Sequence, residues 1–380
     1  MNPASTNAIE IAQRLVQIPS VNPSYDPTSP GEKNVVDWIA AWGRHHQFQV
    51  MVQPVKQDRS NVILSLDSGR PGPHLMFNGH TDTVGVDGMT IDPFAGTIEG
   101  GRLYGRGAAD MKGPLACMMA TLARLKESSS WSGRVSMSAV VDEEFRFVGI
   151  QELLKNHEPI DFAIVGEPTE LRVIRGCKGC LRFQITTHGK AAHSSRPSEG
   201  ASAISAMAAI IPLLEGYFAR RLESISWPEF GTSTGSIGLI TGGTGVNIVP
   251  DRCEIQVDVR LLPNQDGHAI HREVQELLRS ATLPAGTSSE LCDPGLVDPA
   301  FELPAEHRLV QKLLETLNQS KASVAWFSCD ASKIAARGIP CVVLGPGTIQ
   351  EAHTARESIG LDELENGTDT YVRIAEALLQ

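Results

Sequence analysis

Basic residues are in the minority in this sequence, and no segment gathers lysine and arginine into a cluster. The 380 residues carry 33 lysine and arginine side chains against 44 aspartate and glutamate side chains, for a formal net charge of −11. Proteins that bind nucleic acid neutralise phosphate groups with clustered cations. We therefore expect no nucleic-acid partner.

Long hydrophobic runs are also missing. No stretch contains about 18 consecutive apolar residues, the length that a membrane-spanning helix needs. The first fifteen residues lack the basic stretch followed by an apolar stretch that is typical of a secretory signal peptide. We expect a cytoplasmic protein without a membrane partner.

Cysteine is scarce and irregularly spaced. The seven cysteines are an odd number, in a chain long enough to build its cores without disulfide bonds, so we expect reduced and buried thiols. Cys177 and Cys180 have the CxxC spacing of zinc and redox sites. Because neither a second pair nor a helix start accompanies them, we favour two small buried side chains in a strand.

The sequence is rich in short apolar segments that end in polar or glycine-containing residues. Such near-continuous runs predict buried strands of a mostly parallel sheet, and the clearest lie at 61–66, 75–80, 135–141, 161–166 and 340–345. Apolar residues at helical spacing, as at 8–16, predict helices that cover the sheet. The pattern indicates an α/β fold.

The pattern changes between residues 176 and 287, where apolar and polar residues alternate as in strands with one solvated face. A single core stops growing at roughly 250–300 residues, so a chain of this length is expected to form two domains. We predict an α+β domain at 176–287, inserted into an α/β domain that comprises 1–175 and 288–380.

Acidic residues and histidines follow the predicted strands: His80 and Asp82, Asp110, Asp142 to Glu144, Glu167, and His353. The carboxyl ends of strands line the ligand crevice of open α/β sheets, so we expect these side chains to converge. Histidines and carboxylates without thiolates suit zinc, cobalt or manganese. The set predicts a pair of divalent cations, with a bridging carboxylate and one of Glu143 and Glu144 left to accept a proton.

The motifs GHTDT, YGRGAADMKG, DEE, GEPT and EAHTARE, in this order, resemble those of the di-zinc amidohydrolase and metallopeptidase family, as does GKAAHSSRPSEG in the inserted segment. That family includes acetylornithine deacetylase, succinyl-diaminopimelate desuccinylase, aminoacylase and glutamate carboxypeptidase. The resemblance covers nearly the whole chain. It implies a zinc-peptidase-like catalytic domain with an inserted lid and dimerisation domain, two Zn²⁺ per subunit with Co²⁺ or Mn²⁺ as substitutes, and hydrolysis of the amide bond of an N-acyl-L-amino acid by a hydroxide that bridges the metals.

The resemblance also implies roles for single residues of the catalytic domain. It implies five metal ligands, of which Asp110 serves both ions: His80, Asp110 and Glu167 for one, and Asp110, Glu144 and His353 for the other. Glu143 is implied as the general base and Asp82 as the residue that orients the His80 imidazole. A cis peptide bond is implied after Asp110.

In the inserted domain, the resemblance implies that His193 reaches the active site of the partner subunit in a homodimer and donates a hydrogen bond to the developing oxyanion. Asn247 and Arg260 match substrate-contacting positions, and Arg260 offers a forked donor to an α-carboxylate. Ser328 is a further candidate, in a segment that departs from the desuccinylase pattern. VDVRLLP is similar to the pattern of acetylornithine deacetylases, so that activity is the leading expectation. A dipeptidase, a carboxypeptidase or a desuccinylase is the alternative.

Two functions outside this family are alternative hypotheses. Gly231, Ser233 and Gly235 satisfy the GxSxG pattern of serine hydrolases, but a nucleophile elbow requires a buried strand before it and a helix after it. The segment that follows resembles a strand, so we expect a turn. A catalytically silent binding protein is the second hypothesis, and the presence of every implied ligand and of Glu143 argues against it.

Overall fold

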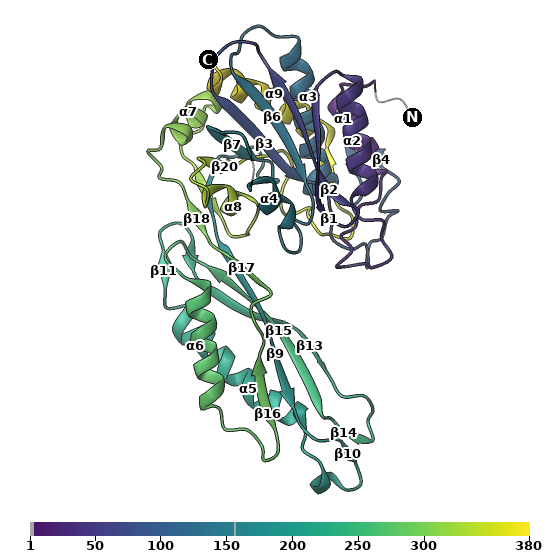
Figure 1. Ribbon diagram of the computed structural model, residues 1–380, viewed down its shortest axis with the longest axis vertical. Coiled ribbons are helices and arrows are strands. Elements are labelled where there is room, and N and C mark those ends of the chain that lie inside the picture. Colours follow the sequence, from purple (N-terminus) through teal and green to yellow (C-terminus); the bar gives the residue numbers. More distant parts are fainter. Residues whose placement is uncertain (1–3, 156) are drawn as a thin grey trace. The chain divides into compact units, whose positions relative to one another are not determined.

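Figure 1 shows the computed structural model, which describes residues 4–155 and 157–380. The chain divides into two compact units. The first unit comprises the residues up to Gly176, Leu303–Ser323 and Cys329–Gln380, and the inserted unit comprises Cys177–Glu302 and Val324–Ser328. The inserted unit continues beyond the boundary predicted at 287. Proline and glycine between 284 and 304 suggest a linker, yet strand β17 (Leu296–Asp298) lies there and pairs with β9 (Gly179–His188).

The sheet of the first unit contains all five predicted strands. Its order is β1 (Gln49–Lys56), β2 (Arg59–Asp67), β6 (Arg134–Val140), β3 (His74–His80), β7 (Phe162–Val165), β20 (Cys341–Val343) and β8 (Ile174–Cys177). Strand β3 is parallel to β6 and β7, and β20 is parallel to β7, whereas β2 is antiparallel to β1 and β6. The α/β class is confirmed, with a parallel centre and antiparallel edges.

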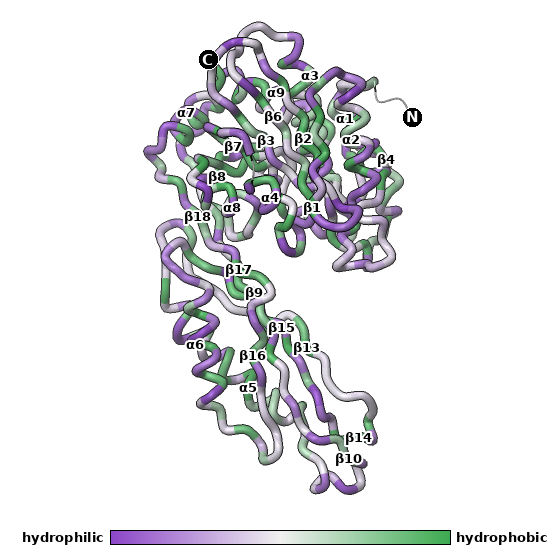
Figure 2. The backbone as a smooth tube through the Cα atoms, viewed as in Figure 1, coloured by the Kyte–Doolittle hydropathy of each residue, from purple (hydrophilic) through white to green (hydrophobic). Residues whose placement is uncertain are grey.

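Five helices share one apolar core with this sheet: α1 (Ala8–Val16), α2 (Lys33–His45), α3 (Gly113–Lys126), α7 (Arg308–Leu317) and α9 (Leu361–Leu378). Leu64, Phe77 and Met137 contribute the sheet's side of the core. Figure 2 shows hydrophobic colouring around β2 and α3, in line with this burial. Two shorter helices of this unit are α4 (Val148–Leu153) and α8 (Ala331–Ala335). This packed core fixes the ends of the parallel strands.

Several short strands complete the first unit and its connections. Strands β4 (Thr97–Glu99), β5 (Arg102–Tyr104) and β21 (Ser358–Gly360) form a small antiparallel sheet. Strands β18 (Phe301–Glu302) and β19 (Ser323–Ala325) lie where the chain passes from one unit to the other.

The inserted unit is an antiparallel sheet packed against two helices. The strand order is β13 (Thr234–Gly242), β15 (Arg252–Leu261), β9 and β16 (Ser288–Leu291), and the helices are α5 (Ala203–Tyr217) and α6 (Gly267–Ser280). Alternate residues of β15, from Cys253 to Leu261, are buried against the helices, as the alternating sequence pattern predicts. Two two-stranded ribbons flank the sheet: β10 (Ala192–His193) with β14 (Ile248–Val249), and β11 (Ser226–Trp227) with β12 (Gly231–Thr232).

One helical segment of the described chain, Ala203–Leu222, is long and apolar enough by length and composition to cross a membrane. Glu215, Arg220 and Arg221 interrupt its apolar residues. Its buried side chains, including Met207 and Ile210, belong to the core of the inserted unit. In this structure the segment is a helix that packs on the core of the inserted unit.

Six of the seven cysteines are buried, as predicted. Cys177 ends β8 and Cys180 lies in β9. Burial raises the pKa of Cys180 to about 12, which disfavours the thiolate needed for metal binding or redox exchange. The interpretation of this CxxC pair as buried strand residues agrees with this environment.

Candidate metal centre

The acids and histidines that follow the parallel strands lie together in the first unit. His80 is the last residue of β3, the acidic segment Asp142 to Glu144 follows β6, and Glu167 follows β7. Asp110 lies in a kinked turn before α3, and His353 lies in the loop after β20. Parallel strands bring their carboxyl ends to one edge of a sheet, which is why segments so distant in sequence meet here.

Asp110 lies between the two histidines. Its Oδ1 is 2.9 Å from His80 Nε2 and its Oδ2 is 3.4 Å from His353 Nε2. A glutamate approaches the same Nε2 atom of each histidine: Glu167 Oε2 lies 4.0 Å from His80 Nε2, and Glu144 Oε1 lies 3.1 Å from His353 Nε2. A carboxylate that presents one oxygen to each half of such a cluster has the arrangement required of a bridging metal ligand.

Two overlapping groups have ligand atoms within 4.8 Å of one another: His80, Asp110 and Glu144, and His80, Glu143 and Glu167. Glu143 thus has a carboxylate oxygen within 4.8 Å of ligand atoms of both His80 and Glu167. The five predicted ligands and Glu143 converge in one cluster, in which His80 is 1% exposed and Glu167 4%. The side chain of His353 is 49% exposed, so the cluster opens to solvent on that side.

Negative charge in this cluster exceeds what the neighbouring cations can balance. Burial raises the pKa of Glu143 well above its usual value, and Glu167 adds to the effect. Burial and then Asp110 raise the pKa of Glu167 and of Glu144. Hydrogen bonds that His353 donates to Asp110 and Glu144 raise its pKa to about 10. In the absence of other cations, the cluster therefore holds protons that free carboxyl and imidazole groups would release.

These features fit a pair of divalent cations. Glu167 Oε1 is buried and has no hydrogen-bond partner among residues 4–155 and 157–380. A buried carboxylate oxygen without a partner is costly, and a coordinated cation would satisfy it. The donors are imidazole nitrogens and carboxylate oxygens without a thiolate, which is the ligand set of zinc, cobalt or manganese sites.

Asp82 lies next to His80 Nδ1 with both its main chain and its carboxylate. The main-chain carbonyl of Asp82 lies 2.9 Å from His80 Nδ1, whereas its carboxylate Oδ1 lies 3.6 Å from the same atom. The carboxylate instead accepts the main-chain N–H groups of Glu143, at 3.1 Å, and Glu144, at 3.2 Å. The main-chain carbonyl of Asp82 therefore orients the buried His80 imidazole. The Asp82 carboxylate anchors the main chain of Glu143 and Glu144.

Glu357 is the last residue of the EAHTARE motif and had no predicted role at the site. It is buried, and its Oε1 accepts the main-chain N–H groups of Ala109 and Asp110, both at 3.0 Å. Arg106 Nη1 donates to its Oε2 at 2.7 Å. The peptide bond between Asp110 and Met111 is cis, as the family resemblance implies. Glu357 thus holds the turn that carries the central aspartate.

Asp330 is another buried acid that was not predicted as a site residue. Its Oδ2 accepts from Asn78 Nδ2 at 2.8 Å, two residues before His80 on β3. Burial raises the pKa of Asp330 to about 6. Its charge contributes to the raised pKa values of Glu143 and Glu167. The only local signal for it in the sequence is an aspartate at the start of a short helix.

The predicted substrate contacts of the inserted unit fall into separate places. His193 is exposed in β10, and its Nδ1 lies 2.8 Å from Ser195 Oγ. Asn247 is close to it, because the Asn247 carbonyl accepts the N–H of Ser194 at 3.0 Å and β10 pairs with β14. Arg260 lies on β15, where its Nε is 2.8 Å from Asp258 Oδ1. Ser328 donates to Asp298.

Arg260 and His193 lie at opposite ends of the sheet of the inserted unit. Arg260 pairs with Cys180, whereas Arg252, eight residues earlier on β15, pairs with His188, where the chain leaves β9 for β10. At about 3.3 Å per residue, this separates the two ends by roughly 26 Å. The structure therefore does not bring Arg260 and His193 together within one chain.

The GxSxG segment has no nucleophile-elbow geometry. Ser233 is fully buried between β12 and β13, and its hydroxyl donates to the main-chain carbonyl of Arg260 at 2.7 Å. A strand follows it rather than a helix. This geometry rules out the serine nucleophile hypothesis for Ser233.

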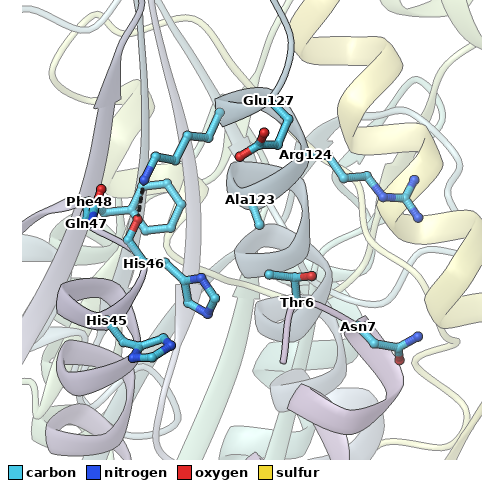
Figure 3. Close-up of a pocket in the computed structure, with 10 residues that line it drawn as sticks. Thr6, Asn7, His45, His46, Gln47, Phe48, Ala123, Arg124 and Glu127 are labelled. Atoms are coloured by element: carbon cyan, nitrogen blue, oxygen red, sulfur yellow. Dashed lines mark hydrogen bonds between the residues drawn. The ribbon is translucent and has the colours of Figure 1, made fainter. Parts of the chain in front are cut away.

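A hollow of about 750 Å³ elsewhere in the first unit is distinct from the acid cluster (Figure 3). Its lining comes from the start of α1, the turn between α2 and β1, and the end of α3. Lys126 is one of the lining residues, and its Nζ donates to the main-chain carbonyl of His46 at 2.6 Å. The side chains that line this hollow include cationic groups and one glutamate. The several carboxylates that meet in the acid cluster are not among them.

Comparison with known proteins identifies the family. The sequence matches the family described as Peptidase family M20/M25/M40 over residues 76–377. Acetylornithine deacetylase of Proteus mirabilis is 33% identical over 375 residues, which cover 96% of this chain and 95% of that protein. The acetylornithine deacetylase of Erwinia tasmaniensis is 33% identical over 362 residues and covers 93% of each chain. The chain belongs to peptidase family M20/M25/M40.

Solved structures of M20 proteins have the same fold. The M20 family metallo-carboxypeptidase of Sulfolobus solfataricus superposes with a TM-score of 0.78 at 18% identity, covering 98% of this chain and 99% of that chain. A dinuclear metal binding peptidase of the M20 family from Bacillus subtilis gives a TM-score of 0.69 at 17% identity, covering 98% of each. Membership of the M20 family makes this chain a hydrolase of amide bonds, as its motifs predict.

Proposed function

We propose that this M20 hydrolase is an acetylornithine deacetylase-like enzyme, which cleaves the amide bond of an N-acyl-L-amino acid and releases a carboxylic acid and a free amino acid. The observation that carries the proposal is the 33% identity to acetylornithine deacetylases over 96% of the chain. The convergence of the predicted acids and histidines in one cluster supports it.

The cofactor in this proposal is a pair of Zn²⁺ ions, with Co²⁺ or Mn²⁺ as substitutes. One ion would be held by His80, Asp110 and Glu167 and the other by Asp110, Glu144 and His353. When bound, such a pair supplies a Lewis acid for the substrate carbonyl and lowers the pKa of water. The position of Asp110 between the two histidines supports its assignment as the shared ligand.

Glu143 is our candidate for the general base. Burial and Glu167 raise the pKa of its carboxyl, so it accepts a proton more readily than a free glutamate does. Its main-chain N–H donates to Asp82, which restrains its position. In the proposed reaction, Glu143 removes a proton from the attacking water and delivers it to the leaving amine as the carbon–nitrogen bond breaks.

The inserted unit would act as a lid and supply substrate contacts. Arg260 would bind the α-carboxylate with its forked guanidinium, and Asp258 holds that side chain in place at 2.8 Å. Ser328 and Asn247 would contribute further polar contacts, and His193 would donate to the oxyanion formed at the acyl carbon. The separation of roughly 26 Å along β15 is too large for one amino-acid derivative to bridge. This supports the hypothesis that His193 and Asn247 serve the active site of a partner subunit.

A homodimer formed through the inserted unit is part of this proposal. Strand β13 is at the edge of the sheet, and its apolar residues Leu239 and Ile240 are 61% and 59% exposed. An unpaired strand edge with exposed apolar side chains is a surface suited to pairing with a second copy. We further propose a cytoplasmic location, which the burial of six cysteines supports.

A substrate panel tests the proposal. Zinc-loaded enzyme should hydrolyse N-acetyl-L-ornithine faster than N-succinyl amino acids and dipeptides, and removal of the metal should abolish the activity. Preference for a dipeptide or for an N-succinyl substrate would replace the deacetylase assignment by another activity of the same family. Full activity in metal-free enzyme would contradict the whole mechanism.

A further inference from the structure

A chain of mostly buried polar side chains runs from the start of helix α2 to the glutamates of the cluster, and three of its members, Glu32, Arg59 and Asn22, were not predicted as site residues. Glu32, at the start of α2, is 0% exposed and accepts from Arg59, the first residue of β2. Arg59 Nε donates to Glu32 Oε2 at 2.8 Å, and Nη2 donates to Oε1. The two side chains therefore form a forked ion pair inside the first unit.

The same pair contacts the acidic turn after β6 in two ways. Glu32 Oε1 accepts the main-chain N–H of Asp142 at 3.2 Å, and Arg59 Nη1 donates to Asp142 Oδ1 at 2.9 Å. Asp142 has φ of 65°, a left-handed conformation that non-glycine residues rarely adopt. Both the backbone and the side chain of this residue are thus fixed by the Arg59–Glu32 pair.

Asn22 connects Asp142 with the anchor of the glutamates. Its amide Nδ2 donates to Asp142 Oδ1 at 2.9 Å and to Asp82 Oδ2 at 2.8 Å. The Asp82 carboxylate in turn accepts the N–H groups of Glu143 and Glu144. An unbroken hydrogen-bonded path leads from the ion pair to the backbone of both glutamates.

Stability alone is a poor explanation for this arrangement. The Glu32 side chain is fully buried and that of Arg59 is 15% exposed, so the pair is largely removed from water, and this desolvation commonly cancels the Coulombic gain. What such a pair supplies is geometry, because a forked guanidinium allows one arrangement of its partners. Here that geometry is transmitted to the turn that carries the proton acceptor and one metal ligand.

We propose that Arg59 and Glu32 are positioning residues, which set the orientation of Glu143 and Glu144 through Asp142, Asn22 and Asp82. Neither touches the reacting atoms. The proposal extends the proposed function, since it relies on Glu143 as the general base and Glu144 as a metal ligand. Loss of the pair should leave substrate binding by the inserted unit unchanged and should weaken both proton transfer and metal binding.

The test compares Arg59→Met, Arg59→Lys, Glu32→Gln and the double variant Glu32→Gln/Arg59→Met in the full-length protein. We expect Arg59→Met and Glu32→Gln to lower kcat by about 10- to 100-fold, to leave KM close to its original value, and to lower Zn²⁺ affinity by a similar factor. Arg59→Lys should recover part of both losses because it restores the charge without the fork. The double variant should lose about as much as either single variant.

A matched control separates positioning from general destabilisation. Val36 is buried on the same helix as Glu32 and outside the polar chain, so Val36→Ala should lower Tm without changing kcat or Zn²⁺ affinity. Zn²⁺ affinity is measured with a chelating indicator and no substrate, so it tests the proposal even if N-acyl amino acids are not hydrolysed. If Arg59→Met does not fold, Glu32→Gln provides the test of the proposal, because this substitution keeps the size of the side chain. Folded Glu32→Gln with unchanged kcat and Zn²⁺ affinity would overturn the proposal.

Discussion

Glu357 holds the main chain of Asp110, because its Oε1 accepts the Asp110 N–H at 3.0 Å. The acceptor lies 247 residues away in sequence, in the loop that leads into β21. The central aspartate of the cluster is therefore fixed by its backbone on one side, while its two carboxylate oxygens remain available to the histidines.

We expect Glu357→Gln to weaken metal binding by about 10- to 100-fold, because the neutral amide accepts more weakly and loses its ion pair with Arg106. Zn²⁺ titration with a chelating indicator measures the change. The exposed Glu365 on α9 provides the control, and Glu365→Gln should titrate like the unmodified protein. Equal affinities for both variants would show that Asp110 keeps its position without Glu357.

Replacing the proposed proton acceptor should separate catalysis from metal binding. Glu143→Gln should keep bound Zn²⁺ and reduce kcat by about 10²- to 10⁴-fold, since the amide cannot take a proton from water. Glu144→Gln should instead lose metal as well as activity. Kinetics together with metal analysis by mass spectrometry distinguishes the two patterns, and near-normal kcat in Glu143→Gln would remove Glu143 from this role.

Metal removal should make thermal stability depend more strongly on pH. In the metal-free cluster, hydrogen bonds to Asp110 and Glu144 raise the pKa of His353 from 6.5 to about 10, and burial raises the pKa of Glu167. Groups whose pKa is raised by folding bind more protons in the folded state, so their contribution is present at low pH and is lost as pH rises. The Tm of the metal-free protein should therefore fall between about pH 6 and about pH 9.

Calorimetry at both pH values checks this, with the Zn²⁺-loaded protein as the control. Bound Zn²⁺ would take the place of those protons, so the loaded protein should show a smaller decrease in Tm. The overall negative charge of the chain affects both forms alike. Parallel Tm curves for the two forms would contradict the prediction.

Arg260 should act on substrate binding. Arg260→Lys keeps the charge but loses the forked donor, so we expect KM to rise by about 10-fold or more while kcat changes less. Arg252 lies on the same strand and is exposed, and Arg252→Lys should leave KM unchanged. A pronounced loss of kcat at unchanged KM in Arg260→Lys would assign Arg260 to the chemical step.

Action of His193 across a dimer can be tested by mixing two inactive variants. His193→Ala subunits lack the oxyanion donor and Glu143→Gln subunits lack the base, but a mixed dimer would contain one complete site if His193 acts in the partner. About half of the dimers would be mixed, each with one of two sites intact, so roughly a quarter of the original activity should return. Absence of recovery after subunit exchange would place His193 in its own subunit's site or outside the mechanism.

Much of the first unit could be predicted from the sequence because its strands are continuous apolar runs. Strands β2, β3, β6, β7 and β20 can each be recognised as a short apolar run. The acids that follow these strands can be recognised because they come directly after such a run. The return from the inserted unit was placed too early, because the short strand β17 lies in a stretch with the composition of a linker. Glu32, Arg59 and Glu357 could not be found in this way, since each acts through a contact with a distant segment.

The amino-acid sequence by itself determined which chemical groups the protein offers and the family to which it belongs, because those groups follow buried strands in a recognisable order. Only the tertiary structure decided that the carboxylate of Asp82 anchors Glu143 and Glu144, and that Arg260 and His193 lie at opposite ends of a sheet. Local patterns in a sequence report which face of an element is buried. Hydrogen bonds between segments dozens to hundreds of residues apart depend on how the whole core packs.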